Sequence, residues 1–346
     1  MGVFEDNVTS ESAPLRELIN SRPARGRYAP SPTGNLHLGN ASTALVAWLS
    51  IRAREGCLVM RMEDLDRARV REGLDRAILE DLAWLGLDWD EGPDRGGPHH
   101  PYEQSNRTSL YDDAFDTLRA EGRVYPCFCS RADIAMAASA PQTPGDEVRY
   151  PGTCRELDDD DVGDRLRQGR IPAWRFRVDP DRDAPSFVDG VRGPCGGAEL
   201  LPPGDFVVRR KDGVAAYQLA VVVDDAAMEI TEVVRGDDLL PSTVRQLILF
   251  DALGYPPPAF AHAPLLLGPD NARLSKRHEG VTLRELRDSG LDACDIVGRL
   301  AWLLGLRPSP QSILPGELIE DFSFPAIVDA PAGIPTDPIT WLPPPM

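Results

Sequence analysis

The stretch RYAPSPTGNLHLGN, from Arg27 to Asn40, decides the fold because a short strand ends and a helix begins within it. The strand is predicted over residues 26–29, just before a turn rich in proline and glycine. Apolar residues then recur at near-helical spacing, Leu45 and Leu49 among them. A turn of this kind, between a strand and a helix, is where doubly wound α/β folds bind nucleotides.

The alternation of strand and helix continues along the chain. A second strand is predicted over Leu58–Met62, and an amphipathic helix over residues 74–85. Further on, the apolar run Leu219–Val223 is interpreted as a buried strand, and residues 230–234 as another, before a helix with Ser242 as its N-cap. This order implies a parallel sheet with right-handed crossovers, so we predict a Rossmann-type, doubly wound α/β sheet.

The segment between these two halves departs from the pattern. It holds most of the cysteines and irregular Gly/Pro stretches, which predict an inserted subdomain. After a short helical segment at Leu283–Leu304, ten of the last forty residues are proline, which is too many for a packed helical domain. The predicted parts are an N-terminal extension (1–24), a Rossmann domain in two halves (25–103 and 214–284), the inserted subdomain (104–213), and a short helical segment with a proline-rich tail (285–346).

Composition and charge exclude several classes of protein. No run approaches the roughly 18 apolar residues of a membrane span, and the polar, acidic stretch Met1–Ser21 is unlike a signal peptide. We therefore expect a cytoplasmic protein with no membrane partner. The formal net charge of −18 argues against a protein that coats nucleic acid non-specifically, because phosphates would be repelled at long range, but it leaves room for a local basic groove.

Two short motifs carry residues suited to a nucleotide. In the first, Gly39 lets a ligand approach the backbone, the helix start presents unpaired N–H groups to an anion, and His37 can donate to a phosphate. In the second, Arg273, Lys276 and Arg277 place three cations within five residues. Taken singly, each motif has a plainer interpretation: a structural hydrogen bond for the histidine and a solvated basic loop for the cations.

Together, the sequences His37-Leu-Gly-Asn40 and Leu274-Ser-Lys-Arg277 resemble the two signature sequences of the class I aminoacyl-tRNA synthetases. The resemblance implies that the motifs bracket ATP, accompanied by Mg²⁺, while an amino-acid carboxylate attacks the α-phosphorus. It makes His37 and Lys276 the main catalytic residues. Negative charge builds up on the phosphate oxygens in the transition state, and hydrogen-bond donors already in position stabilise it. The implied ATP-binding residues are Pro30, Gly34, His37, Gly39, Asn40, Arg273, Ser275, Lys276 and Arg277.

Three further segments, Arg27–Ser31, Arg61–Asp66 and Val234–Leu239, resemble the glutamyl branch of that class. A guanidinium fork grips a carboxylate bidentately, so the arginines in the first and last segments suit an acidic substrate. For any one arginine alone, the alternative is a surface salt bridge. Glu63 is suited to the substrate ammonium and Tyr217 to a hydrogen bond with the bound amino acid. The implied glutamate-binding residues are Arg27, Tyr28, Ala29, Pro30, Ser31, Glu63, Tyr217 and Arg235.

Cysteines indicate a metal site in the inserted subdomain. Cys127, Cys129 and Cys154 offer three sulfurs, whereas structural zinc takes four ligands, and Tyr150 is the candidate for the fourth. From the spacing alone, zinc and reduced core thiols both remain open. The resemblance favours one structural Zn²⁺, because a Cys-x-Cys…Tyr-x-x-x-Cys arrangement occurs in the inserted domain of glutamyl-queuosine tRNA(Asp) synthetases and of some glutamyl-tRNA synthetases.

The acceptor of the glutamyl group is inferred from the end of the chain. After Leu306 only forty residues remain, and we expect no anticodon-binding domain from them. The chain also has Gln218 where ordinary glutamyl-tRNA synthetases usually carry asparagine. Both features resemble the glutamyl-queuosine tRNA(Asp) synthetases, truncated paralogues that activate glutamate without tRNA. Their implied second step transfers glutamate to the cyclopentene-diol of queuosine, at the wobble position of tRNA(Asp).

The expected partners are therefore ATP, L-glutamate and the queuosine-bearing anticodon loop of tRNA(Asp), and the protein is expected to be a monomer. Two alternatives remain open. One is a truncated glutamyl-tRNA synthetase that charges a tRNA 3′ end. The other is a non-catalytic RNA- or partner-binding module that has kept the fold, and the presence of His37, Glu63 and Lys276 argues against it.

Overall fold

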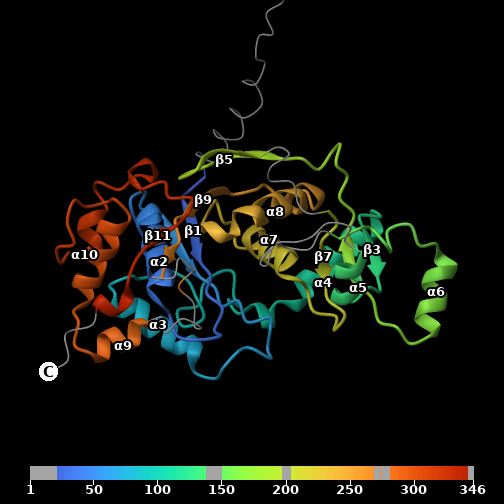
Figure 1. The fold of residues 1–346 in the computed structure, drawn as a ribbon, viewed down its shortest axis with the longest axis horizontal. Helices are drawn as coiled ribbons and strands as arrows, with labels where there is room; N and C mark the ends of the chain where they lie inside the picture. The colour runs from blue at the N-terminus through green and yellow to red at the C-terminus, as the bar shows by residue number, and fades with distance from the viewer. Residues whose placement is uncertain (1–21, 138–149, 197–203, 269–273, 275–280, 342–346) are drawn as a thin grey trace, which may run out of the picture.

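The computed structural model describes residues 22–137, 150–196, 204–268, 274 and 281–341 (Figure 1). Its centre is a parallel sheet in the strand order β2-β1-β8-β9, which confirms the predicted parallel α/β architecture. The strands are β1 (Arg25–Tyr28), β2 (Cys57–Met60), β8 (Glu232–Gly236) and β9 (Ala259–Ala263).

The order in which the parallel strands are added to the sheet reverses between β1 and β8. From β1 the chain passes through helix α2 (Leu38–Arg52) to β2 on one side, and from β8 it passes through helix α8 (Leu240–Ala252) to β9 on the other. Because β1 and β8 are neighbours, they form a topological switch point. In open parallel sheets, ligands bind outside the carboxyl ends of the strands at such a point.

Two buried apolar clusters lie against the sheet. The first includes α2 and extends to α3 (Leu74–Trp84), α9 (Leu283–Asp288) and α10 (Ala293–Leu303). The second is built on α4 (Thr108–Ala120), α7 (Tyr217–Ala227) and α8. Figure 1 shows these two groups of helices on either side of β1 and β9. None of the helices in the described ranges is both long and apolar enough to span a bilayer.

Helix α7 corrects a prediction made from the sequence. The run Leu219–Val223, interpreted as a buried strand, lies inside this helix. All five of its residues are buried, and an uninterrupted apolar run has no periodicity that distinguishes a buried helix from a buried strand. Helix α8 also begins earlier than expected, at Leu240, because Pro241 suits the first turn of a helix; Ser242 is therefore not its N-cap.

The predicted helical segment Leu283–Leu304 is two helices, α9 and α10. Gly290 separates them with φ of +89°, a left-handed conformation that favours glycine. In the described part of the tail, β11 (Ile334–Pro335) pairs in parallel with β10 (Leu266–Leu267). Leu318, Ile327 and Trp341 return to the first apolar cluster, so the tail packs on the Rossmann core.

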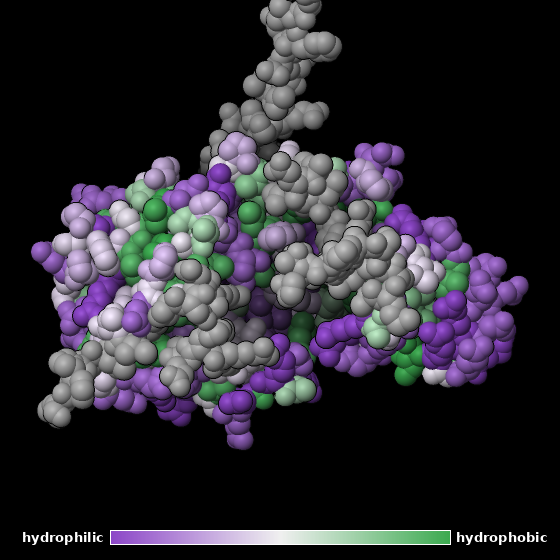
Figure 2. All heavy atoms as spheres, in the orientation of Figure 1, coloured by the Kyte–Doolittle hydropathy of each residue, from purple (hydrophilic) through white to green (hydrophobic). Residues whose placement is uncertain are grey.

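A second, antiparallel sheet lies between the two halves of the Rossmann core in sequence. Its strands are β3 (Val124–Cys127), β4 (Ala173–Phe176) and β7 (Val207–Arg209). The same region carries α5 (Arg131–Ala137), α6 (Asp159–Arg167) and a hairpin of β5 (Ser186–Asp189) and β6 (Gly193–Gly196). Figure 2 shows mainly hydrophilic residues at the end of the molecule that holds α6, where the aspartates 158–161 are exposed.

Candidate active site

A pocket of about 800 Å³ opens at the carboxyl ends of β1 and β8, at the switch point of the sheet. Its wall comes from the turn after β1, the first residues of α2, the end of β8 and the start of α7. The described residues predicted to bind glutamate or ATP all lie on this wall: Arg27, Tyr28, Ala29, Pro30, Ser31, Gly34, His37, Gly39, Asn40, Glu63, Tyr217 and Arg235.

His37 is the N-cap of α2. Its Nδ1 accepts hydrogen bonds from the backbone N–H of Gly39 (3.1 Å) and of Asn40 (3.3 Å), and the Asn40 side chain accepts from the His37 N–H. These helix N–H groups are therefore not unpaired, contrary to the expectation from sequence. Because Nδ1 is an acceptor, a neutral ring carries its proton on Nε2. The structural hydrogen bond and a donor role for His37 are thus compatible.

Arg27 is buried at the end of β1, with only 4% of its surface exposed. Its Nη1 donates to the carbonyl oxygen of Val234 (3.2 Å), and its Nε lies 3.4 Å from Oδ1 of Asp225. The same Asp225 oxygen accepts from Nη1 of Arg61 at 2.7 Å. Asp225 therefore holds two arginines in place beneath the pocket.

Glu63 follows β2 and reaches the pocket wall beside this group. Its Oε1 lies 3.3 Å from Nη2 of the fully buried Arg61. Burial raises the pKa of the Glu63 carboxyl, and Arg61 and Arg27 offset only part of that rise. A cation bound next to Glu63 would stabilise its charged form.

Arg235 is buried near the end of β8, and all of its hydrogen-bond partners are neutral acceptors. Its Nε donates to His262 (3.0 Å), its Nη1 to Gln246 (2.7 Å) and its Nη2 to Thr243 (2.7 Å). Within the part of the chain that the structure describes, Arg235 forms no ion pair. A carboxylate entering the pocket would therefore meet a buried guanidinium on which Asp225 and Glu63 act only from beyond ion-pair distance.

The second predicted motif lies largely outside the described residues. Arg273, Ser275, Lys276 and Arg277 belong to that undescribed part. Leu274, within the motif, is described: it is buried, it donates its backbone N–H to Leu266, and it lies on the pocket wall.

Sequence reasoning missed the residues that hold these arginines. Asp224 and Asp225 are buried acids at the end of the apolar run of α7, which was the available signal. Asp224 accepts hydrogen bonds from Gln104, Arg107 and Tyr111 and so fastens α7 to the start of α4. His262, Thr243 and Gln246 gave no local signal, because they reach Arg235 from other elements.

The three cysteines predicted as metal ligands cluster at the end of the second sheet. Their sulfurs lie within 4.8 Å of one another, with 3.6 Å between Cys129 and Cys154. Zn–S bonds of about 2.3 Å at tetrahedral angles place ligand sulfurs roughly 3.8 Å apart. The Tyr150 hydroxyl lies 3.4 Å from the Cys127 sulfur, so its oxygen can complete the set. The donor set and its spacing therefore fit a zinc ion.

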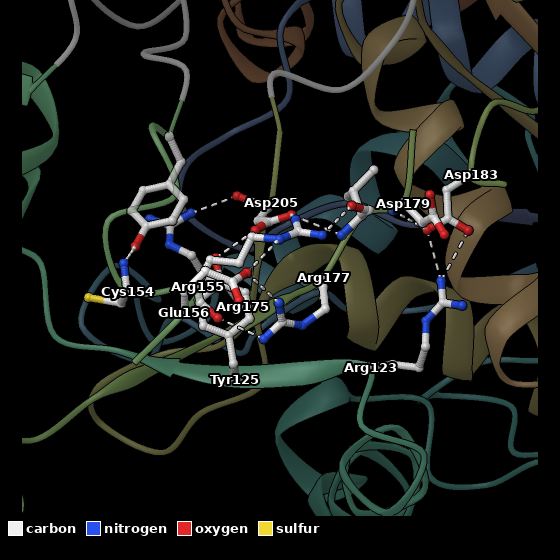
Figure 3. A network of polar contacts seen from close by, with 12 residues as sticks. Arg123, Tyr125, Cys154, Arg155, Glu156, Arg175, Arg177, Asp179, Asp183 and Asp205 are labelled. Atoms are coloured by element: carbon white, nitrogen blue, oxygen red, sulfur yellow. Dashed lines mark hydrogen bonds and ion pairs between the residues drawn. The ribbon is translucent and has the colours of Figure 1, made fainter. Parts of the chain in front are cut away.

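Figure 3 shows the polar network that braces this sheet beside Cys154. Asp205 accepts from the Tyr125 hydroxyl (2.6 Å), from Nη1 of Arg155 (2.5 Å) and from the backbone N–H of Val178 (2.9 Å). Arg155 directly follows Cys154 in the chain. Asp205 thus anchors the segment that carries Cys154 to the strands of the second sheet.

Comparison with known proteins agrees with this geometry. Residues 23–313 match the family described as tRNA synthetases class I (E and Q), catalytic domain. The solved glutamate–tRNA synthetase of Elizabethkingia anophelis superposes with a TM-score of 0.79 at 29% identity, covering 92% of this chain and 69% of that one. The chain therefore belongs to the class I tRNA synthetases of the glutamate and glutamine branch, which are ATP-dependent ligases.

Three relatives that match over at least 92% of their own length are named Glutamyl-Q tRNA(Asp) synthetase. The protein of Symbiobacterium thermophilum is 53% identical over 92% of this chain and 98% of its own length, and that of Nitratidesulfovibrio vulgaris is 48% identical over 90% and 96%. A protein of Acidithiobacillus ferrooxidans named Glutamate–tRNA ligase 2 is 47% identical, but the match covers only 58% of its length. The predicted family is confirmed.

Proposed function

We propose that this protein activates L-glutamate with ATP to form glutamyl-adenylate, without tRNA, and then transfers the glutamyl group to the cyclopentene-diol of queuosine in tRNA(Asp). One observation carries the proposal: two buried arginines and a glutamate share the wall of a pocket with the N-terminus of α2. An acidic amino acid has the complementary charges.

The amino-acid end of the pocket supports glutamate as the substrate. Arg235 is buried among neutral partners. Arg27 forms an ion pair with Asp225, but the same carboxylate oxygen also accepts from Arg61. Substrate carboxylates would supply the missing negative charge through charge-assisted hydrogen bonds. Glu63 would take the substrate ammonium, and the Tyr217 hydroxyl would hydrogen-bond to the bound amino acid.

The phosphate end of the pocket supports adenylation. The substrate α-carboxylate would attack the α-phosphorus of ATP, and pyrophosphate would leave. His37 and Lys276 would stabilise the charge that develops on the phosphate oxygens, with Gly34, Gly39, Asn40, Arg273, Ser275 and Arg277 holding the nucleotide and Mg²⁺ accompanying it. The hydrogen bonds that His37 Nδ1 accepts from the start of α2 support this role, because they leave the ring proton on Nε2.

The proposed acceptor is supported by the relatives named Glutamyl-Q tRNA(Asp) synthetase, which this chain matches over 92–98% of their length. A cyclopentene-diol presents vicinal hydroxyl groups, as does the terminal ribose of a tRNA. Replacing one diol by the other keeps the transfer chemistry unchanged: a hydroxyl oxygen attacks the glutamyl carbonyl and AMP leaves.

We also propose that Cys127, Cys129, Cys154 and Tyr150 hold one structural zinc ion. The ion would join the end of β3 to the segment 150–154, which lies between β3 and β4 in the chain. It would contribute to folding and take no part in the reaction.

The activation step is tested by glutamate-dependent ATP–pyrophosphate exchange in the absence of tRNA. We expect exchange in the wild type and a loss on the order of 100–1000-fold in Lys276→Ala, because a donor to the transition state is removed. The chain has one other lysine, so Lys211→Ala is the matched control and should retain exchange. Circular dichroism checks that both variants fold. Exchange near the wild-type rate in Lys276→Ala, or no exchange in the wild type, would refute the proposed activation step.

The acceptor is tested separately, with labelled glutamate and tRNA(Asp) that either carries or lacks queuosine. We expect transfer only to the modified tRNA, and no transfer to queuosine when its diol has been cleaved with periodate beforehand. Charging of unmodified tRNA(Glu) at its 3′ end would instead identify a short glutamyl-tRNA synthetase, and activation without any transfer would exclude both acceptors.

A further inference from the structure

Arg235 and His262 occupy paired positions on the neighbouring strands β8 and β9. The Nε of Arg235 donates to Nε2 of His262 at 3.0 Å, so this ring nitrogen must be an acceptor. The ring proton of a neutral imidazole then lies on Nδ1, which donates to Oδ2 of Asp189 at 2.6 Å. The tautomer of His262 thus decides whether Arg235 meets an acceptor or a second donor.

Asp189 is built to hold that tautomer. It ends β5, in the hairpin that lies against β9, and it is buried together with His262 and Arg235. Its other oxygen, Oδ1, accepts three backbone N–H groups, from Val191, Arg192 and His262, at 3.0–3.1 Å. Only Oδ2 is left to face the ring.

The charges around His262 keep it neutral. Burial lowers the pKa of the imidazole, and Arg235 adds to this effect, while Asp189 and the more distant Asp237 oppose it. Asp237 is itself paired with Arg192. A neutral ring with its proton on Nδ1 donates to Asp189, and its Nε2 accepts from Arg235 and can also accept from the Thr243 hydroxyl, 3.2 Å away.

The remaining contacts fix the plane of the guanidinium group. Thr243 and Gln246 each accept one N–H from an Nη atom, and Gln246 is held in turn by Gln218. Each Nη atom of an arginine carries a second N–H. With Nε tied to His262, those two hydrogens have a defined direction.

We propose that His262, locked in one tautomer by Asp189, is a positioning residue that orients Arg235 for a substrate carboxylate and so contributes to selectivity for glutamate. This inference rests on the proposed function. The competing explanation is that Asp189 and His262 only anchor the β5–β6 hairpin on β9, in which case they affect stability alone.

The first test is the isosteric substitution Asp189→Asn. The three backbone donors keep the amide oxygen in the Oδ1 position, so the amide NH₂ must face the ring. It then donates to Nδ1, the ring proton moves to Nε2, and Arg235 loses this acceptor. The new Nε2–H faces Arg235 Nε and competes with Arg235 for the Thr243 hydroxyl oxygen, 3.2 Å from Nε2. We expect the KM for glutamate in pyrophosphate exchange to rise at least about tenfold. The KM for ATP, and kcat at saturating glutamate, should stay within about threefold.

A pair of substitutions at position 262 separates the acceptor from the bulk of the ring. His262→Gln keeps an acceptor at the reach of Nε2 and should restore the KM for glutamate to within about threefold of wild type, whereas His262→Leu should show the full rise. Asp183→Asn is the matched control, because Asp183 is also buried and pairs with Arg123 but does not touch this group. It should leave the KM for glutamate unchanged.

The tautomer itself is read by ¹⁵N NMR of histidine-labelled protein, which has only five histidines. We expect the His262 proton on Nδ1 in the wild type and on Nε2 in Asp189→Asn. An unchanged tautomer, an unchanged KM for glutamate in Asp189→Asn, or equal KM values for His262→Gln and His262→Leu would overturn the inference. A wild type without glutamate-dependent exchange would instead refute the proposed function. The failure of that function can therefore be told apart from the failure of this inference.

Discussion

Glu63 is the residue whose surroundings most clearly call for a cation from outside the chain. Burial raises the pKa of its carboxyl even though Arg61 and Arg27 lie nearby. If Glu63 binds the substrate ammonium, Glu63→Gln replaces a charged hydrogen bond by a neutral one, with a loss of about 1.5–3 kcal/mol. The KM for glutamate should then rise about 10- to 100-fold in pyrophosphate exchange. Exposed Glu80, paired with Arg76 and Arg284, supplies the control Glu80→Gln, which should behave as wild type.

The pH dependence gives the same substitution a second readout. A raised pKa means that Glu63 is protonated at a higher pH than an ordinary glutamate, whose pKa is about 4.3. As the pH falls toward that raised value, the wild type loses the negative charge and its KM for glutamate should increase. Glu63→Gln has no such charge to lose, so a wild-type pH profile in this variant would contradict the assignment.

At the level of elements, local chemistry made some parts of the structure predictable. The strand–turn–helix of β1 and α2 could be predicted because its turn residues and helical spacing lie within one short stretch. The cysteine cluster could be predicted because its ligands are close in sequence. Helix α7 was misread, since its buried face has no periodicity. The partners of Arg235 could not be predicted for another reason. His262 reaches Arg235 because β8 pairs with β9, and Asp189, 73 residues from His262, reaches the ring because the β5–β6 hairpin packs against β9.

The two largest sheets among the described residues have different means of support. The parallel sheet is covered by helices on both sides. The antiparallel sheet β3-β4-β7 shares the second apolar cluster with α4 and α7, and polar networks and the cysteine cluster support it further. We therefore expect about one zinc ion per purified chain, lost in Cys129→Ser together with several degrees of thermal stability. Pyrophosphate exchange at saturating substrates should persist, because the pocket lies on the other sheet. Cys195→Ser, outside the cluster, should keep the metal; full zinc content in Cys129→Ser, or none in the wild type, would refute the site.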